Sequence, residues 1–138
     1  LEVRCALEEL AVQLACDRID KEEVSGLHAA ADHFRDVLDS DDITLIAQAD
    51  EAFHDVIFTA TDNGRLIQLL NNLREQMYRY RIEYLKKKEC YPQLLAEHKA
   101  IIEAIESHDK GKATEITGQH INNQADTVVG TLRHRDEE

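Results

Sequence analysis

The chain has 138 residues, a length typical of one domain with a continuous core. Its composition, 43% hydrophobic and 32% charged, excludes a disordered protein. A formal net charge of −12 disfavours contact of this segment with nucleic acid or anionic membranes, because acidic surfaces repel phosphate groups. The sequence shows no secretory signal and no apolar run near the roughly 20 residues of a membrane span, so we expect a cytoplasmic domain.

One proline, five glycines and few aromatic residues favour long helices over sheets. Apolar residues at helical spacing predict six helices, over about residues 2–18, 20–38, 40–60, 64–86, 92–107 and 109–132. The connections are short, which favours antiparallel neighbours. The expected fold is therefore all-α, an antiparallel bundle of six or seven helices that forms one domain over residues 1–138.

Several helix ends carry recognisable signals. Asp20 and Glu23 have the spacing of a capping box, and Asp109 is placed to cap the last helix. Pro92 suits the first turn of the fifth helix, where its missing N–H costs nothing. The first helix has no cap residue before it, so we expect the chain to be part of a longer protein.

Four polar residues fall on the apolar faces of the predicted helices. Asp50 and His54 lie four residues apart on one face of the third helix. His98 lies in the middle of the apolar face of the fifth helix, and His120 has the same position in the sixth. Burying a carboxylate without a partner costs several kcal/mol of folding free energy. We therefore expect a cation near Asp50 that compensates its charge.

Our interpretation is a metal site formed by Asp50, His54, His98 and His120. Imidazole and carboxylate ligands together suit a divalent transition metal, Zn²⁺, Ni²⁺, Mn²⁺ or Fe²⁺, with zinc as the first choice. The alternative for each histidine is a hydrogen-bonded core residue, and Asp50 and His54 could equally form an intrahelical hydrogen bond. The coincidence of four such residues in one small bundle favours the metal site.

The other residues of metal-binding type are interpreted differently. The remaining histidines are expected at the surface: His28, His33, His108 and His134. The three cysteines, Cys5, Cys16 and Cys90, form no CxxC pair, and we interpret them as reduced thiols rather than as a disulfide framework or metal ligands.

The order of these motifs carries a family resemblance. The matching segments are Arg4-x-x-Leu7-Glu8, Asp50-x-x-Phe53-His54, Asn63, Glu97-His98, Ile101-x-x-Ala104-Ile105, and Asp109 with Ala113 and His120. They cover nearly the whole chain. The sequence resembles the C-terminal ligand-binding (FCD) domain of GntR-family bacterial transcription regulators of the FadR subfamily. Asp50, His54, His98 and His120 correspond to the metal ligands of that family.

The resemblance implies a homodimeric bundle of six or seven helices that binds a small organic acid against the metal. It also implies that DNA is bound by a separate N-terminal winged helix-turn-helix domain that this chain lacks. For the effector carboxylate, Arg4 and then Arg81 are the candidate cations. Gln124, on the same stripe as His120, is the third effector-binding candidate. The alternative for either arginine is a position at the surface or rim.

Two other functions remain open at this point. A metal with free coordination positions could serve a hydrolase-like enzyme, and a metal could also have a purely structural role. Against an enzyme, the chain has no HExxH motif and no paired Glu-x-x-His motifs. Glu97, next to His98, should point about 100° away from it, so no general base is expected beside the ligands. We therefore predict a sensor domain rather than an enzyme.

Overall fold

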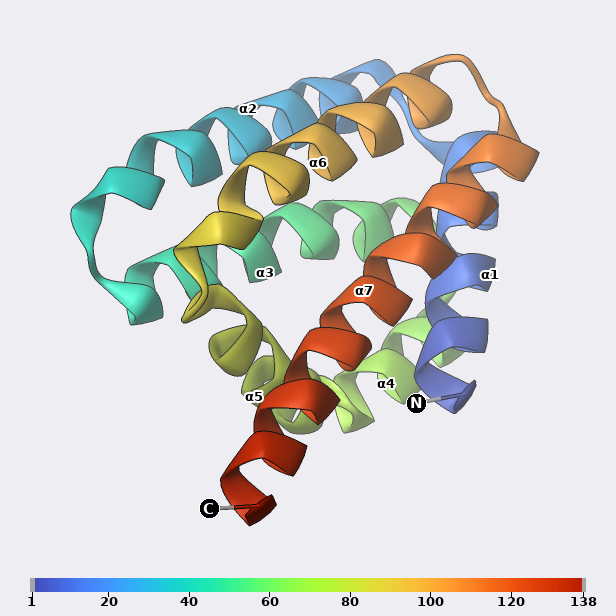
Figure 1. Cartoon of the computed structure of the whole chain (residues 1–138). Coiled ribbons are helices and arrows are strands. Elements are labelled where there is room, and N and C mark those ends of the chain that lie inside the picture. The colour runs from blue at the N-terminus through green and yellow to red at the C-terminus, as the bar shows by residue number, and fades with distance from the viewer. Residues whose placement is uncertain (1, 138) are drawn as a thin grey trace.

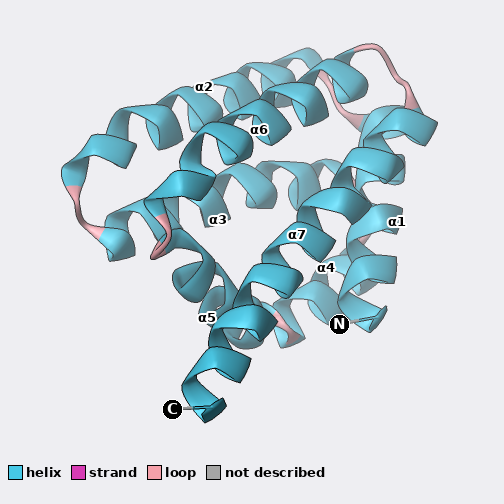
Figure 2. Cartoon of the chain, in the orientation of Figure 1, coloured by secondary structure: helices cyan, strands magenta, loops and turns pink. Residues whose placement is uncertain are grey.

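The computed structural model describes the backbone of residues 2–137 and the side chains of residues 2–128. The described residues form helices and short turns without strands (Figures 1 and 2), so the predicted all-α fold is confirmed. The α-helices are α1 (Glu2–Arg18), α2 (Lys21–Val37), α3 (Ile43–Ala60), α4 (Gly64–Asn72), α5 (Arg74–Leu85), α6 (Tyr91–Glu106) and α7 (Lys110–Glu137). Two 3₁₀ turns, η1 (Leu38–Ser40) and η2 (Lys88–Cys90), lie in the connections.

Helix α3 buries one of its faces, which carries Asp50, Phe53 and His54, against other helices. It packs against α1, α2 and α5, while α6 packs against α2 and α7. In Figure 1, α2 and α6 run beside each other above α3, and α7 crosses in front of the bundle toward α5. The helices that carry the four predicted metal ligands, α3, α6 and α7, meet through their side chains, since His54 contacts both His98 and His120.

The predicted caps are present. Asp20 accepts a hydrogen bond from the backbone N–H of Glu23 (2.7 Å), and the Glu23 side chain accepts one from Asp20 (3.2 Å), which completes the capping box. Asn63 accepts from the N–H of Leu66 at 3.1 Å at the start of α4. Asp109 accepts from the N–H of Lys112 at 3.0 Å at the start of α7. These caps set where the helices begin.

The expected fourth helix was wrong as a single element. It is divided into α4 and α5 at Leu73, whose backbone has φ −98° and ψ −2° and lies between the two helices. The apolar residues 66, 70, 73 and 77 keep helical spacing through this junction, so periodicity does not reveal it. The last helix also continues to Glu137, beyond the predicted end near residue 132.

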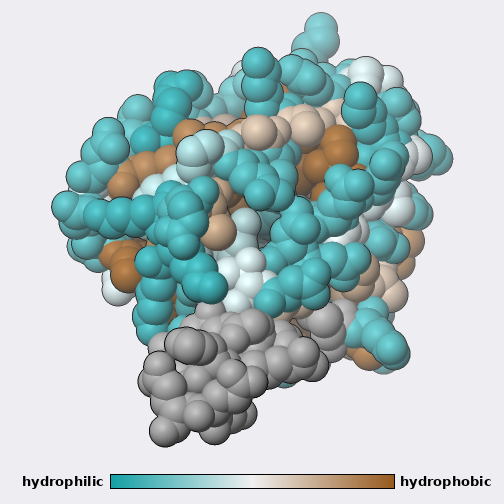
Figure 3. Space-filling model, in the orientation of Figure 1, coloured by the Kyte–Doolittle hydropathy of each residue, from teal (hydrophilic) through white to brown (hydrophobic). Residues whose placement is uncertain are grey.

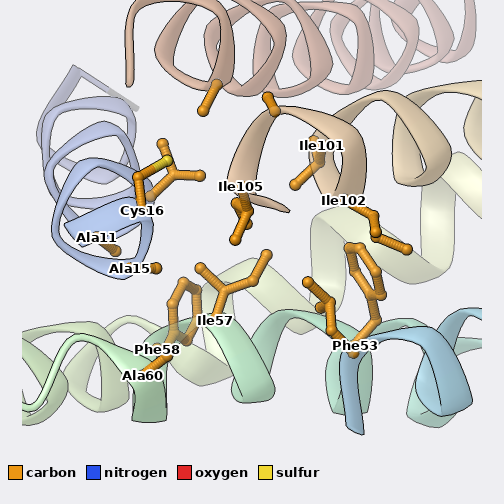
Figure 4. Packing of buried hydrophobic residues seen from close by; sticks show 14 of the residues in the cluster. Ala11, Ala15, Cys16, Phe53, Ile57, Phe58, Ala60, Ile101, Ile102 and Ile105 are labelled. Carbon is orange, nitrogen blue, oxygen red and sulfur yellow. The ribbon is translucent and has the colours of Figure 1, made fainter. Parts of the chain in front are cut away.

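Two apolar clusters form the core. Figure 4 shows part of the first, in which Phe53 and Ile57 of α3 face Ile101 and Ile105 of α6. The second includes Phe34, Ile46, Ala47, Tyr84, Leu85 and Leu94. His98 stacks on Phe53 (ring centroids 4.1 Å apart) and also contacts Phe34 (4.7 Å). It therefore lies where the two clusters meet.

The outside of the bundle is polar. Hydrophilic side chains cover most of the face visible in Figure 3, with smaller hydrophobic areas between them. The large hydrophobic side chains exposed among the described residues are Val3, Leu10, Leu45 and Leu69. Within the described residues, none of the helices combines the length and apolar character needed to cross a membrane.

The cap of the central helix gives a stability prediction. Asp42 accepts a hydrogen bond from the N–H of Leu45 at 3.1 Å and begins α3. Asp42→Ala should lower the free energy of unfolding by about 1 kcal/mol, because the N–H loses its acceptor. Urea unfolding followed by circular dichroism would measure the loss. Asp39→Ala, which removes an exposed carboxylate near the same connection, is the control. Equal stability of both variants would contradict the role of this cap.

Candidate metal centre

Three of the four predicted ligands form one compact group. The ligand atoms of Asp50, His54 and His98 all lie within 4.8 Å of one another, and all three residues are buried. Helix α3 places Asp50 and His54 one turn apart, and α6 brings His98 against them. Asp50 Oδ1 lies 2.8 Å from Nε2 of His98 and 3.6 Å from Nε2 of His54. One carboxylate oxygen therefore faces two imidazole nitrogens.

The fourth predicted ligand, His120, lies beside this group rather than within it. Its ring stacks on that of His54 with centroids 5.4 Å apart, and its centroid lies 6.5 Å from that of His98. The side chain is buried, and it enters from α7. The fold thus brings the four predicted residues into one neighbourhood, while their joint ligation of a metal stays a prediction.

Arg81 provides the cation that the burial of Asp50 demands. Its Nε donates to Asp50 Oδ2 at 2.6 Å, and its Nη1 lies 3.8 Å from Glu51 Oε2. The Arg81 side chain is only 3% exposed, so it is neither a surface nor a rim residue. Arg81, which was predicted to bind the effector, thus binds the second oxygen of the Asp50 carboxylate.

The protonation of the group follows from burial and charge. Burial alone raises the pKa of Asp50, but the neighbouring His54 and Arg81, with the hydrogen bond to His98, outweigh it. They hold the Asp50 pKa well below its ordinary value. Burial lowers the pKa of His98 despite the opposing effect of Asp50, and the neighbouring His54 and His120 lower it further. A neutral imidazole beside a carboxylate is the form that binds metals.

Two histidine nitrogen atoms without hydrogen-bond partners indicate whether Asp50, His54 and His98 could hold a metal ion. His54 Nε2 is buried without a hydrogen-bond partner, and it faces Asp50 Oδ1 across 3.6 Å. His98 Nδ1 is also buried and unpaired. Buried polar atoms are rarely left without partners. The orphaned His54 nitrogen and the carboxylate oxygen opposite it suit the donor set of a divalent transition metal.

Glu97 lies beside one of the predicted ligands, although no candidate general base was expected there. Because Glu97 precedes His98 by one position on α6, its side chain points away from His98, as expected. It points toward α7 instead. Glu97 Oε2 lies 2.6 Å from Nδ1 of His120, and the Glu97 side chain is 12% exposed. Sequence reasoning missed this contact because it depends on how α6 and α7 pack.

The other two effector candidates are also buried. Arg4 forms a 2.7 Å ion pair with Glu8, and its Nη1 has no hydrogen-bond partner. Gln124 is 1% exposed with its Oε1 unpaired. Glu8 also borders a cavity of about 10 Å³, the size of one water molecule, together with His54, Thr117 and His120. The Arg4–Glu8 pair therefore reaches the edge of the metal group.

The remaining histidines and the cysteines lie apart from this site. His28, His33 and His108 are exposed as predicted, although Nδ1 of His108 also bonds the carbonyl of Cys16 at 2.6 Å. The side chain of His134 lies outside the described residues. The three cysteines are free thiols.

Comparison with known proteins assigns the family. The FCD domain family matches residues 1–123. This chain is an FCD domain. It is 24% identical over 132 residues to YdhC of Bacillus subtilis (strain 168), an uncharacterised HTH-type transcriptional regulator, covering 95% of this chain and 59% of YdhC. The fold is similar to that of E. coli McbR/YncC, with a TM-score of 0.77 and 17% identity over 91% of this chain and 65% of that one.

The family assignment confirms the resemblance to the ligand-binding domain of HTH-type regulators. The FCD domain belongs to transcription regulators rather than to enzymes, in agreement with the prediction that this domain is not an enzyme. The chain spans less than two thirds of the length of the two relatives described above.

Removing Arg81 should destabilise the metal-free domain strongly. Arg81→Met leaves the buried Asp50 carboxylate without its cation, which should cost about 3–5 kcal/mol. Arg79→Met on the same helix is the control, because its ion pair with Glu75 is solvent-exposed and should contribute less than about 1 kcal/mol. Urea unfolding in the presence of a chelator would measure both. Similar losses in the two variants would contradict the structural role of the Arg81–Asp50 pair.

The metal-free domain should lose stability as the pH falls. An unfolded chain protonates His98 near its ordinary pKa of 6.5, whereas the folded protein resists this, so unfolding becomes easier below about pH 6.5. Asp50 acts in the same direction at lower pH, with stability lost as the pH falls below its ordinary value of 3.8. Unfolding between about pH 7.5 and 5.5 tests the His98 contribution. His98→Gln should flatten this dependence, while His33→Gln should keep the slope of the parent.

Proposed function

We propose that this FCD domain senses a small organic acid through a divalent transition metal held by Asp50, His54, His98 and His120. The observation that carries the proposal is the convergence of Asp50, His54 and His98 within 4.8 Å in the interior of the bundle. Two of these residues come from α3 and one from α6, so the site is built on rigid elements.

Zinc is our first choice of metal, with nickel, manganese and iron as the alternatives. A set of imidazole nitrogens and one carboxylate oxygen suits all four ions. When bound, the ion would offer free coordination positions to a carboxylate, or to a carboxylate and a hydroxyl group, of the effector. With four protein ligands bound, the ion would have free positions for the effector only if its coordination number exceeds four.

Recognition of the acid would involve the buried polar groups near the metal. Arg4 is our first candidate, since its Nη1 is buried and unpaired and could donate to a carboxylate. Gln124 offers an unpaired amide oxygen to a hydroxyl group. Arg81 could contact the effector only by releasing Asp50, so we rank it last.

The whole regulator would use this domain to control DNA binding. We propose a cytoplasmic homodimer in which a separate N-terminal helix-turn-helix domain contacts DNA. The net charge of −12 supports this division, because the acidic domain itself repels phosphates. The effector would act by binding one arrangement of the dimer more tightly than another, which changes the spacing of the DNA-binding domains.

The two alternatives make different demands on the site. A hydrolase needs a base, and Glu97 beside His120 is the one observation that favours it. A purely structural metal would be expected to balance the buried charge of Asp50, yet Arg81 already does so. The family assignment favours the sensor over the enzyme.

Metal analysis and calorimetry would test the proposal. The purified domain, loaded with zinc and freed of excess metal, should retain about one ion per chain. His98→Ala combined with His120→Ala should retain almost none, while the control with His28→Ala and His33→Ala should bind like the parent, because both of its histidines are exposed.

Calorimetric titration with hydroxy, keto and dicarboxylic acids should then give binding to the zinc-loaded parent and not to the metal-free one. Loss of acid binding in the double-alanine variant at positions 98 and 120, with its fold intact, would support the sensor. Binding of acids equally well without metal would overturn the metal-dependent mechanism. Turnover of an added ester or carboxylate substrate would favour the enzyme instead.

A further inference from the structure

Glu97 makes one polar contact that the proposed ligand set does not explain. Its Oε2 lies 2.6 Å from Nδ1 of His120, and its other oxygen, Oε1, is buried without a partner. The two residues come from different helices, α6 and α7, which pack against each other. The contact therefore joins the face of α6 that does not carry His98 to a ligand on the neighbouring helix.

We propose that Glu97 is a positioning residue that holds His120 with its Nδ1 protonated and its Nε2 presented to the metal. This inference rests on the proposed function, because it assigns the geometry of one ligand of that site. Glu97 itself does not ligate the metal. An ionised carboxylate only accepts hydrogen bonds, so the imidazole nitrogen beside it must carry the proton. The other nitrogen is then left with its lone pair free.

The contact has the form of a functional rather than a stabilising hydrogen bond. Burying a carboxylate costs free energy, which a structural pair usually offsets with several hydrogen bonds. Arg81 and His98 together occupy both oxygens of Asp50. Among the described side chains, Glu97, in contrast, has only its bond to His120, and its Oε1 stays unpaired. A carboxylate that orients a metal-binding histidine through its second nitrogen recurs in metal sites and increases the basicity of the ligand.

Helix α6 would then control two ligands. His98 contributes its own imidazole, and its chain neighbour Glu97 acts on His120 from a face turned by about 100°. Any shift of α6 relative to α7 would change both at once. Glu97 thereby couples the packing of these two helices to the geometry of the site.

The test uses zinc as the probe and four proteins: the parent, Glu97→Ala, Glu97→Gln and the control Glu103→Gln. Glu103 lies on the same helix and is exposed, so its variant loses the same charge away from the site. Zinc affinity would be measured by competition with a chromophoric chelator. Nitrogen NMR of the imidazoles would report the tautomer of His120 with and without zinc. Circular dichroism of the metal-free proteins would establish that each variant folds.

Glu97→Ala should weaken zinc binding by about 10- to 100-fold. Glu97→Gln should lose less, because its amide oxygen still accepts the hydrogen bond, and Glu103→Gln should match the parent. The metal-free parent should show His120 protonated at Nδ1, and this preference should disappear in Glu97→Ala. A merely structural role for Glu97 would leave the zinc affinity of the folded Glu97→Ala variant unchanged.

Two results would overturn the inference. One is His120 protonated at Nε2 in the metal-free parent, and the other is a folded Glu97→Ala variant that binds zinc as tightly as Glu103→Gln. Failure of the parent itself to bind zinc would instead refute the metal-dependent function. The tautomer of the metal-free protein would still decide whether Glu97 orients His120, so the two failures are distinguishable.

Discussion

The buried carboxylate of Asp50 is the constraint on which the rest of the structure depends. Removing a charge from water costs several kcal/mol unless partners surround it. Here the partners come from separate elements: α5 supplies Arg81 to one oxygen, and α6 supplies His98 to the other. The packing of α3 against its neighbours is therefore tied to a polar interaction, and a shift of any of these helices would leave a buried charge unpaired.

The polar group and the apolar core support each other. His98 lies between Phe53 of one hydrophobic cluster and Phe34 of the other, which restricts its ring. Surrounding a ligand with apolar side chains also excludes water, and this strengthens the electrostatic interactions inside. The same burial that keeps the His98 imidazole neutral thus prepares it to bind a cation.

A site with this construction suits a sensor. Arg81 balances the charge of Asp50 without a metal, so the fold does not depend on the ion for neutrality. In the proposed sensor, a metal and its effector would act on an already folded bundle, and their binding energy would be available to favour one arrangement over another. Glu97 on α6 and Arg81 on α5, which contact the proposed ligands, would connect such changes to the helices.

The sequence by itself determined the helical class, most helix ends, the FCD family and the four inward polar residues, because periodicity and capping are local properties. It did not reveal the division between α4 and α5, since the apolar stripe continues through Leu73. Only the tertiary structure decided that Arg81 pairs with Asp50 and that Glu97 reaches His120. Both contacts join residues on different helices, and their distances depend on how the helices pack rather than on spacing along the chain.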